Sequence, residues 1–184
     1  MFIICGMDAH DNTLTNRIGV DREAAETMTV RNTQEGRAKL FRYLKDLAQE
    51  HEGARILVAY EASPIGFGIY DDCVAAGIAC HILAPMKMPK STRDRKRKHD
   101  KADAQKIFEL LKGHVLAGNE LPDIWIPDHQ TRDDREIVRS RLDVAEKLTA
   151  LKTQVQMLLK RNRVVKPEYI GLSWRKSYRR WLWE

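Results

Sequence analysis

Four acidic residues occupy positions from which their carboxylates could act together on a metal ion. Asp8 ends the apolar run FIICGMDA, and Glu61 ends a second apolar run, ARILVAYE. Asp100 and Asp103 lie three residues apart in KSTRDRKRKHDKADA (residues 90–104), where a basic run gives way to a helical pattern. Carboxylate oxygens suit Mg²⁺ or Mn²⁺. Two such ions can activate an attacking oxygen and stabilise a leaving oxygen in phosphodiester cleavage.

This chemistry requires elements that bring the four acids to one place. Continuous apolar runs are typical of strands buried on both faces, so Asp8 and Glu61 each stand at a strand end. If these strands are parallel neighbours, both acids lie at the same carboxyl edge of the sheet, where α/β proteins place ligand sites. Asp100 and Asp103 share one face near the start of a helix. We therefore predict catalytic and metal-binding roles for all four acids, with two Mg²⁺ or Mn²⁺ ions.

Each acid also has a simpler interpretation. Asp8 could be only a polar residue that ends a strand, and Glu61 could belong to a helix start. Asp100 could be an N-cap, with Asp103 placed favourably in the helix dipole. The conjunction of the four, rather than any single acid, carries the metal-site hypothesis. His10 has two interpretations as well, an ordinary loop histidine or a residue that orients a water.

The order of predicted elements indicates the fold class. Three strands open the chain, and then helices alternate with two further strands. We expect the helices to run from Asn32 or Thr33 to about His51, from Ser63-Pro64 to about Ala76, and from the basic run to Gly118. The glycines of SPIGFG (residues 63–68) are expected to allow close packing of the second helix. This order predicts an α/β fold, a mixed five-stranded sheet with flanking helices, as in ribonuclease-H-like domains.

A long helix is predicted after the connector LPDIWIPD (residues 121–128). Between residues 130 and 163, seven positions alternate in steps of four and three: Ile137, Arg141, Val144, Leu148, Leu151, Val155 and Leu158. They form a heptad seam that is interrupted at Arg141. So narrow an apolar stripe on so long a helix favours a coiled coil or helical arm.

The charge distribution points to a polyanionic partner. The chain of 184 residues carries a net charge of +6, with 43% hydrophobic and 32% charged residues, as in a globular protein. Eight Lys or Arg residues lie between residues 87 and 101, and eight more lie between residues 160 and 180. Such blocks are typical of phosphate contact, although a solvated surface would look the same. The predicted nucleic-acid-binding residues are Lys87, Lys90, Arg93, Arg95, Lys96, Arg97, Lys98, Lys101, Lys160, Arg161 and Arg163.

The cysteines and the amino-terminal residues bear on localisation. Cys5, Cys73 and Cys80 make an odd count without a CxxC pair, which favours buried, reduced thiols in a cytoplasmic protein. The first apolar run is too short to cross a bilayer and lacks the features of a signal peptide. No membrane association is therefore expected.

Several segments together resemble a known family. GMDAH, YEASPIGFGIYDDCVAAGIACHILAP, KHDKADAQKI and ELPDIWIPD are similar, in order and spacing, to the amino-terminal half of the DEDD transposases of the insertion-sequence 110 family. That family includes the Piv-type DNA invertases. Its four acidic positions fall on Asp8, Glu61, Asp100 and Asp103. The departures are mild, with Met7 and Ala9 in the first segment and His99 where Thr is common.

The resemblance implies a RuvC-like nuclease domain at 1–127, a coiled-coil arm at 128–165 and a basic, Trp-rich linker at 166–184. It also implies cutting and rejoining of DNA, a structured bridge RNA as guide, a homo-oligomer through the coiled coil, and action on the nucleoid of a bacterium or archaeon. The family's serine-bearing transposase domain is expected to be missing, so the chain should be incomplete for full activity. Trp174, Trp181 and Trp183 could stack on bases or pack against that domain or a partner subunit.

Two other functions remain open. One is a stand-alone RuvC-like, structure-specific nuclease or junction resolvase that uses the same acids. The other is a non-catalytic module for nucleic-acid binding and assembly, in which the acids are structural. The sequence specifies neither the target and donor sites, nor the guide RNA, nor the oligomer number, nor the choice among insertion, excision and inversion.

Overall fold

A computed structural model describes residues 1–88, 100–171 and 173–184, apart from the side chains of Asp100 and Lys101. The elements in chain order are β1 (Phe2–Ala9), β2 (Thr13–Val20), β3 (Glu26–Arg31), α1 (Gln34–Glu50), β4 (Arg55–Glu61), α2 (Gly68–Ala75), β5 (Ala79–Leu83), α3 (Asp100–Ala117), α4 (His129–Arg161) and α5 (Lys176–Trp181). Two compact units contain them, Met1–Trp125 and Ile126–Glu184.

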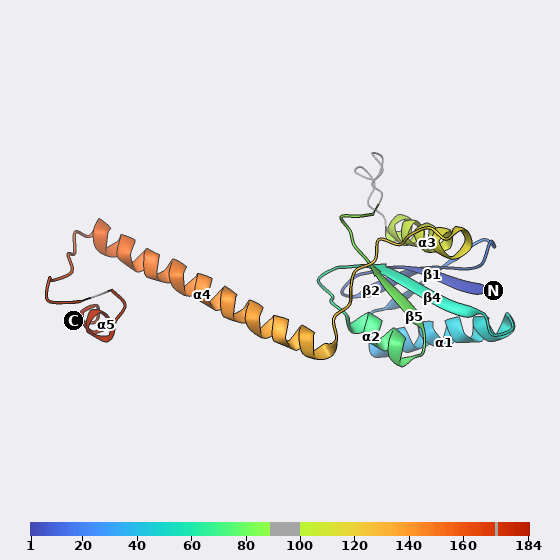
Figure 1. The fold of residues 1–184 in the computed structure, drawn as a ribbon, viewed down its shortest axis with the longest axis horizontal. Coiled ribbons are helices and arrows are strands. Elements are labelled where there is room, and N and C mark those ends of the chain that lie inside the picture. Colours follow the sequence, from blue (N-terminus) through green and yellow to red (C-terminus); the bar gives the residue numbers. More distant parts are fainter. Residues whose placement is uncertain (89–99, 172) are drawn as a thin grey trace. The chain divides into compact units, whose positions relative to one another are not determined.

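The five strands form one sheet in the order β3-β2-β1-β4-β5. The first three are antiparallel, whereas β1, β4 and β5 run parallel. This is the ribonuclease-H-like arrangement of a mixed five-stranded sheet, so the prediction of the fold class is confirmed. The continuous apolar runs lie at its centre, because β1 and β4 each have strand neighbours on both sides and helices on both faces (Figure 1).

Helices cover the two faces of the sheet separately. Figure 1 shows α1 and α2 on one face and α3 on the other. The apolar side of α3 packs on the strands in a cluster that includes Ile4, Ala59, Ile107, Phe108 and Leu111. On α1, Leu40 and Leu44 are fully buried. Each helix therefore buries one stripe against the sheet, as its periodicity predicts.

The predicted helix ends hold at α1 and α3 but not at the start of α2. Thr33 caps α1 by accepting a hydrogen bond from the Gly36 amide at 3.1 Å. Helix α2 begins at Gly68 rather than at Ser63-Pro64. The reason is Gly66, whose φ of +70° places it in the left-handed region and interrupts the helical path. The close-packing interpretation of Gly66 and Gly68 is also wrong, because a Cβ on either would meet no atom within 4 Å.

The three cysteines are free thiols between the sheet and the helices α1 and α2. Cys5 and Cys73 are buried, and Cys80 is half-buried. Burial raises the pKa of Cys5 above its ordinary value. A hydrogen bond with Cys73, together with burial, raises the pKa of Cys80. The prediction of burial is confirmed for Cys5 and Cys73 and holds in part for Cys80.

The connector that follows α3 pairs with the outer edge of β5. Leu83 and Asp123 form an isolated antiparallel bridge. The amide of Ala84 donates to the carbonyl oxygen of Pro122 at 2.7 Å, and the amide of Ile124 donates to that of Ile82 at 2.9 Å. This pairing was not predicted from the sequence of the connector.

The second unit consists of α4, 33 residues long, and a carboxyl-terminal segment containing α5. Asp128 caps α4 by accepting a hydrogen bond from the Thr131 amide at 2.7 Å, and this bond lowers the pKa of the Asp128 carboxyl. In the carboxyl-terminal segment, Tyr178 is buried between Trp174 and Trp181 at ring distances of 5.3 and 5.4 Å. Trp174 and Trp181 thus pack within this unit, whereas Trp183 is exposed. In the described part of the chain, no helix has the length and apolar character needed to cross a membrane.

Candidate metal and nucleic-acid site

Asp8 and Glu61 end adjacent parallel strands at the same level. In the register of β1 and β4, Met7 lies opposite Tyr60, so the next residues on the two strands are Asp8 and Glu61. Neighbouring strands lie about 4.8 Å apart, which brings the two backbone positions side by side. The metal-site hypothesis requires these strands to be parallel and adjacent, and β1 and β4 have both properties.

Both acids also belong to the sheet face that α3 covers. Two residues before Asp8 is Gly6, where a Cβ would stand 2.6 Å from the carbonyl oxygen of Ala104 in α3. Two residues before Glu61 is Ala59, which is buried in the α3 cluster. Because side chains alternate along a strand, Asp8 and Glu61 are on this same face, beyond the part that the helix fills.

The direction of α3 carries Asp100 and Asp103 toward the same edge. Val115, near the end of the helix, lies beside Phe2 at the start of β1, whereas Ala104 lies against Gly6. The helix therefore runs antiparallel to β1. From Gly6 to Asp8 the strand advances about 6.6 Å. Four helical residues cover a similar distance, so the first turn of α3 reaches the level of Asp8.

The structure thus brings the four predicted acids to one end of the sheet through their backbone positions. Asp103 is half-buried, Glu61 is exposed, and Asp100 is the first residue of α3. Among the described residues, no three His, Cys, Asp or Glu side chains are close enough to hold a metal ion, and the Asp100 side chain is not among them. The four-carboxylate cluster therefore stays a prediction.

His10 contacts the first of these acids. Its Nε2 atom lies 3.1 Å from Oδ2 of Asp8, whose side chain is only 15% exposed. The backbone of His10 is fixed on both sides. The His10 amide donates to the Thr13 carbonyl at 2.9 Å, and the His10 carbonyl accepts a hydrogen bond from Asn32 Nδ2 at 2.9 Å. The contact places the His10 ring beside the first of the four predicted acids.

A polar network extends from this turn to α1 and α2. Asn32 Oδ1 accepts a hydrogen bond of 2.7 Å from Arg37 Nη1, and Arg37 Nε donates to Asp72 Oδ2 at 2.5 Å. The network links the turn that carries His10 to both helices on the opposite face of the sheet. Sequence reasoning considered Asn32 only as a helix cap, and no local signal indicates its bond to His10.

The predicted basic residues fall in three places. Lys87 is exposed just after β5. Lys160, Arg161 and Arg163 are exposed at the end of α4, in the second unit. The other predicted basic residues lie outside the described part of the chain, which also excludes the side chain of Lys101: Lys90, Arg93, Arg95, Lys96, Arg97, Lys98 and Lys101. In the described part of the chain, the elements that flank them are β5, where Leu83 lies opposite Glu61, and α3, which begins at Asp100.

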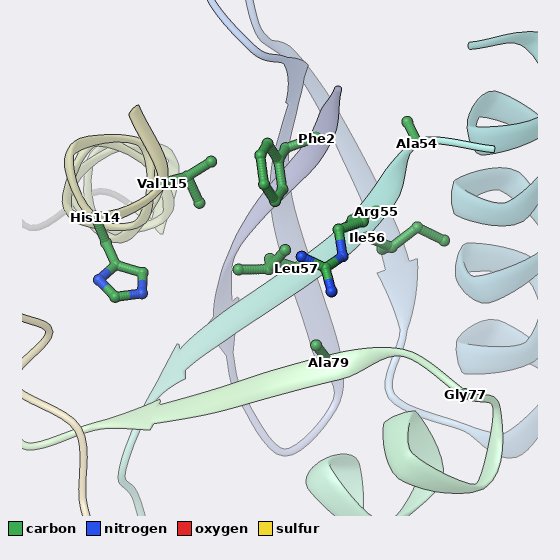
Figure 2. Close-up of a pocket in the computed structure, with 9 residues that line it drawn as sticks. All are labelled: Phe2, Ala54, Arg55, Ile56, Leu57, Gly77, Ala79, His114 and Val115. Carbon is green, nitrogen blue, oxygen red and sulfur yellow. The ribbon is translucent and has the colours of Figure 1, made fainter. Parts of the chain in front are cut away.

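A cavity of about 630 Å³ lies at the other end of the same strands. Figure 2 shows His114 and Val115 on α3 beside Phe2, Arg55 and Leu57 on the strands. Phe2 and Arg55 are the first residues of β1 and β4, so this cavity is at the amino edge of the sheet. It is therefore separate from the edge that carries the four acids.

Comparison with known proteins gives a consistent result. Residues 5–163 match the model of the DEDD transposases of insertion sequence 110, described as "Transposase". The chain is 32% identical over 149 residues to "Putative transposase y4qE" of Sinorhizobium fredii (strain NBRC 101917 / NGR234), an alignment that covers 80% of this chain and 35% of that protein. It is 27% identical over 139 residues to "Transposase for insertion sequence element IS1533" of Leptospira borgpetersenii, covering 76% of this chain and 38% of that protein. The chain spans just over a third of the length of these relatives.

Solved structures of RuvC also align with the chain. The RuvC structure of Thermus thermophilus covers 66% of this chain and 99% of its own length, at 12% identity and a TM-score of 0.43. RuvC of T. thermophilus in complex with a Holliday junction substrate covers 67% of this chain and 100% of its own length, at 12% identity and a TM-score of 0.45.

Proposed function

The chain belongs to the DEDD transposase family of insertion sequence 110, and we propose that it is the nuclease part of a DNA transposase or recombinase that cuts and rejoins phosphodiesters. One observation carries the proposal. Asp8 and Glu61 end adjacent parallel strands on the face that α3 covers, and the first turn of α3, with Asp100 and Asp103, extends to the same edge.

The residues at this edge fit hard divalent cations. Asp8, Glu61, Asp100 and Asp103 would supply carboxylate oxygens, which Mg²⁺ and Mn²⁺ prefer. The chain's buried thiols do not compete for this site, because Cys5 precedes Gly6 in β1 and so faces α1 and α2 rather than α3. Two ions bound there would supply activation of an attacking oxygen and stabilisation of a leaving oxygen.

The protein's own groups have distinct tasks in this proposal. His10 orients the Asp8 carboxylate through the 3.1 Å contact. The basic segment between β5 and α3 attracts the phosphate backbone of DNA, and each neutralised phosphate releases a counterion. Because this segment joins the chain at the edge that carries the acids, DNA bound to it would lie near them.

The partners follow from family membership and from the second unit. We infer that DNA is the substrate and that a structured bridge RNA serves as guide, with Lys160, Arg161 and Arg163 as contacts for nucleic acid at the end of α4. We infer that the exposed heptad seam of α4 joins copies of the chain. Strand transfer would require the serine-bearing domain that the family resemblance implies. A polypeptide of residues 1–184 is therefore expected to bind metal and DNA without completing recombination by itself.

Calorimetric titration of Mn²⁺ tests the metal site. Wild-type chain is expected to show binding that Asp8→Asn and Glu61→Gln each weaken strongly. Asp46→Asn, on the exposed side of α1, is the matched control and should bind like wild type. The metal-site proposal fails if wild type binds no Mn²⁺ or if the three variants bind alike. That outcome would favour a non-catalytic assembly module.

Incubation with a branched DNA junction and Mn²⁺ tests the reaction. We expect the chain to bind the junction and to leave it largely uncut. Efficient cleavage that Asp8→Asn abolishes would instead indicate a stand-alone junction nuclease. That cleavage would also identify Asp8 as part of the reacting site of this chain alone.

A further inference from the structure

Helix α4 presents a long apolar row that nothing in its own unit covers. None of its described residues is buried. Ile137, Val144, Leu148, Leu151 and Leu158 are each between 49% and 69% exposed. Scattered exposed hydrophobic residues are common on proteins, but a row of them along one helix is typical of an interaction surface.

We propose that a second copy of this chain covers the row and that the two α4 helices pair in antiparallel orientation. This inference rests on the self-association proposed above and adds its direction. The steps of four and three define two sets of seam positions, the first and fourth places of a heptad. The first-place residues are Asp134, Arg141, Leu148 and Val155; the fourth-place residues are Ile137, Val144, Leu151 and Leu158.

A parallel pair would stack like charges in the seam. In parallel coiled coils, each first-place residue faces the same residue of the partner helix. Asp134 would then face the partner's Asp134, and Arg141 the partner's Arg141. Like charges that face each other in an interface are strongly unfavourable.

An antiparallel pair removes these clashes without a shift of register. First-place residues then face fourth-place residues of the partner, so Asp134 lies opposite the partner's Leu158 and Arg141 opposite the partner's Leu151. Leu148 meets the partner's Val144 in the same alignment, which overlaps nearly the whole length of α4. The long aliphatic stem of Arg141 can cover the opposing Leu while its guanidinium reaches water.

Charges beside the seam favour the same orientation. In this alignment, Asp133 flanks the partner's Arg161, an attractive pair near each end. Lys147 approaches the partner's Lys147 at the centre, but Asp143 Oδ2 is 2.6 Å from Lys147 Nζ and offsets that charge. Opposite charges on the flanking positions set the orientation of coiled coils.

The carboxyl-terminal segment leaves the row accessible. It packs on the neighbouring stripe of α4, where Lys152 Nζ lies 5.8 Å from the Trp174 ring. A cavity of about 370 Å³ between this segment and the helix is lined by Leu159, Tyr178 and Trp181. Leu151 and Leu158 nevertheless remain 57% and 51% exposed, so a partner helix can reach them.

Spin labels at one position distinguish the orientations. The label is placed by Glu136→Cys, an exposed site, and pulsed electron paramagnetic resonance measures the label-to-label distance. In the antiparallel alignment, residue 136 lies level with the partner's residue 156, so the labels are separated by roughly 30 Å along the axis. In a parallel pair they are level with each other. A control label at Thr149→Cys should give a short axial separation, roughly 9 Å, in the antiparallel pair.

Sedimentation equilibrium of two matched variants supplies the second test. Leu151→Glu would face the partner's Arg141 in the antiparallel pair, whereas Leu148→Glu would face the partner's Val144. We expect Leu148→Glu to raise the dissociation constant roughly tenfold more than Leu151→Glu, because a buried charge without a partner is costly. Equal dissociation constants for Leu148→Glu and Leu151→Glu, or a short distance between the Glu136→Cys labels, would overturn only the antiparallel orientation. A monomeric wild type would overturn self-association as well, and neither result bears on metal binding.

Discussion

Gly6 in β1 lies directly against the backbone of α3: a Cβ there would stand 2.6 Å from the Ala104 carbonyl oxygen. Any larger residue must push α3 away from the sheet, because backbone atoms cannot rotate aside. The helix carries Asp100 and Asp103 in its first turn. This one close approach therefore sets the distance between the helix acids and the strand acids.

Gly6→Ala is expected to lower the free energy of unfolding by about 1–3 kcal/mol, the usual cost of overpacking a core. It should also weaken Mn²⁺ binding, because α3 is displaced at its first turns. Denaturant unfolding and calorimetry measure the two effects. Gly68→Ala is the control, since a Cβ there meets no atom within 4 Å. Unchanged stability and metal affinity in Gly6→Ala would show that α3 can shift freely.

His10→Ala should weaken Mn²⁺ binding roughly tenfold, the lower end of what loss of a ligand's hydrogen-bond partner costs. The side chain of His10 is 47% exposed, so stability should change little. His10→Gln is the matched variant, because its amide nitrogen can replace Nε2 beside Asp8. We expect it to restore most of the affinity in a titration at pH 8. Identical affinities for wild type and both variants would exclude a positioning role for His10.

Replacement of Arg95, Lys96 and Arg97 by Ala should weaken DNA binding and flatten its salt dependence. If each contacts one phosphate, the slope of log K against log salt falls by about 0.9 per residue. Filter binding or fluorescence anisotropy over a salt series measures this slope. The control removes the same charge from the exposed side of α1 through Lys39→Ala, Arg42→Ala and Lys45→Ala. If the slope of log K against log salt falls by the same amount in both triple variants, the basic segment has no specific contact with DNA.

The native thiols should react slowly with a disulfide reagent at pH 8. Burial raises the pKa of Cys5, and the bond with Cys73 raises that of Cys80, so these two thiols stay protonated there. A thiol with a raised pKa reacts only as the pH rises toward that value. In denaturant, all three cysteines should react at once. Rapid reaction of the folded chain would mean that the sheet opens on the side of α1 and α2.

Local patterns in the sequence predicted most of the elements. The apolar stripe of α1 and the capping residue Thr33 before it are local signals. They were sufficient to predict where this helix begins and ends. The start of α2 was wrong for a physical reason. Ser63 and Pro64 are local signals for a helix start, but the left-handed conformation of Gly66 delays the helix until Gly68.

The candidate site depends on relationships that no local pattern contains. The predicted strand ends indicated Asp8 and Glu61 as candidate site residues. The register that places Met7 opposite Tyr60, however, comes from long-range pairing. Similarly, Asn32 holds the His10 carbonyl across 22 residues of sequence. Type and position of the acids were therefore predictable, whereas the direction of α3 and the contacts of His10 required the structure.

The pairing of the connector with β5 has a consequence for how the sheet meets other molecules. An open strand edge offers unpaired amides and carbonyls to any passing strand. The bonds from Ala84 to Pro122 and from Ile124 to Ile82 occupy that edge of β5. This pairing blocks strand addition at β5, in aggregation or in recruitment of a peptide. The opposite margin of the sheet is β3, where the charged residues Glu26 and Arg31 disfavour strand addition. Backbone hydrogen bonds therefore protect one edge of the sheet from strand addition, and charged side chains protect the other.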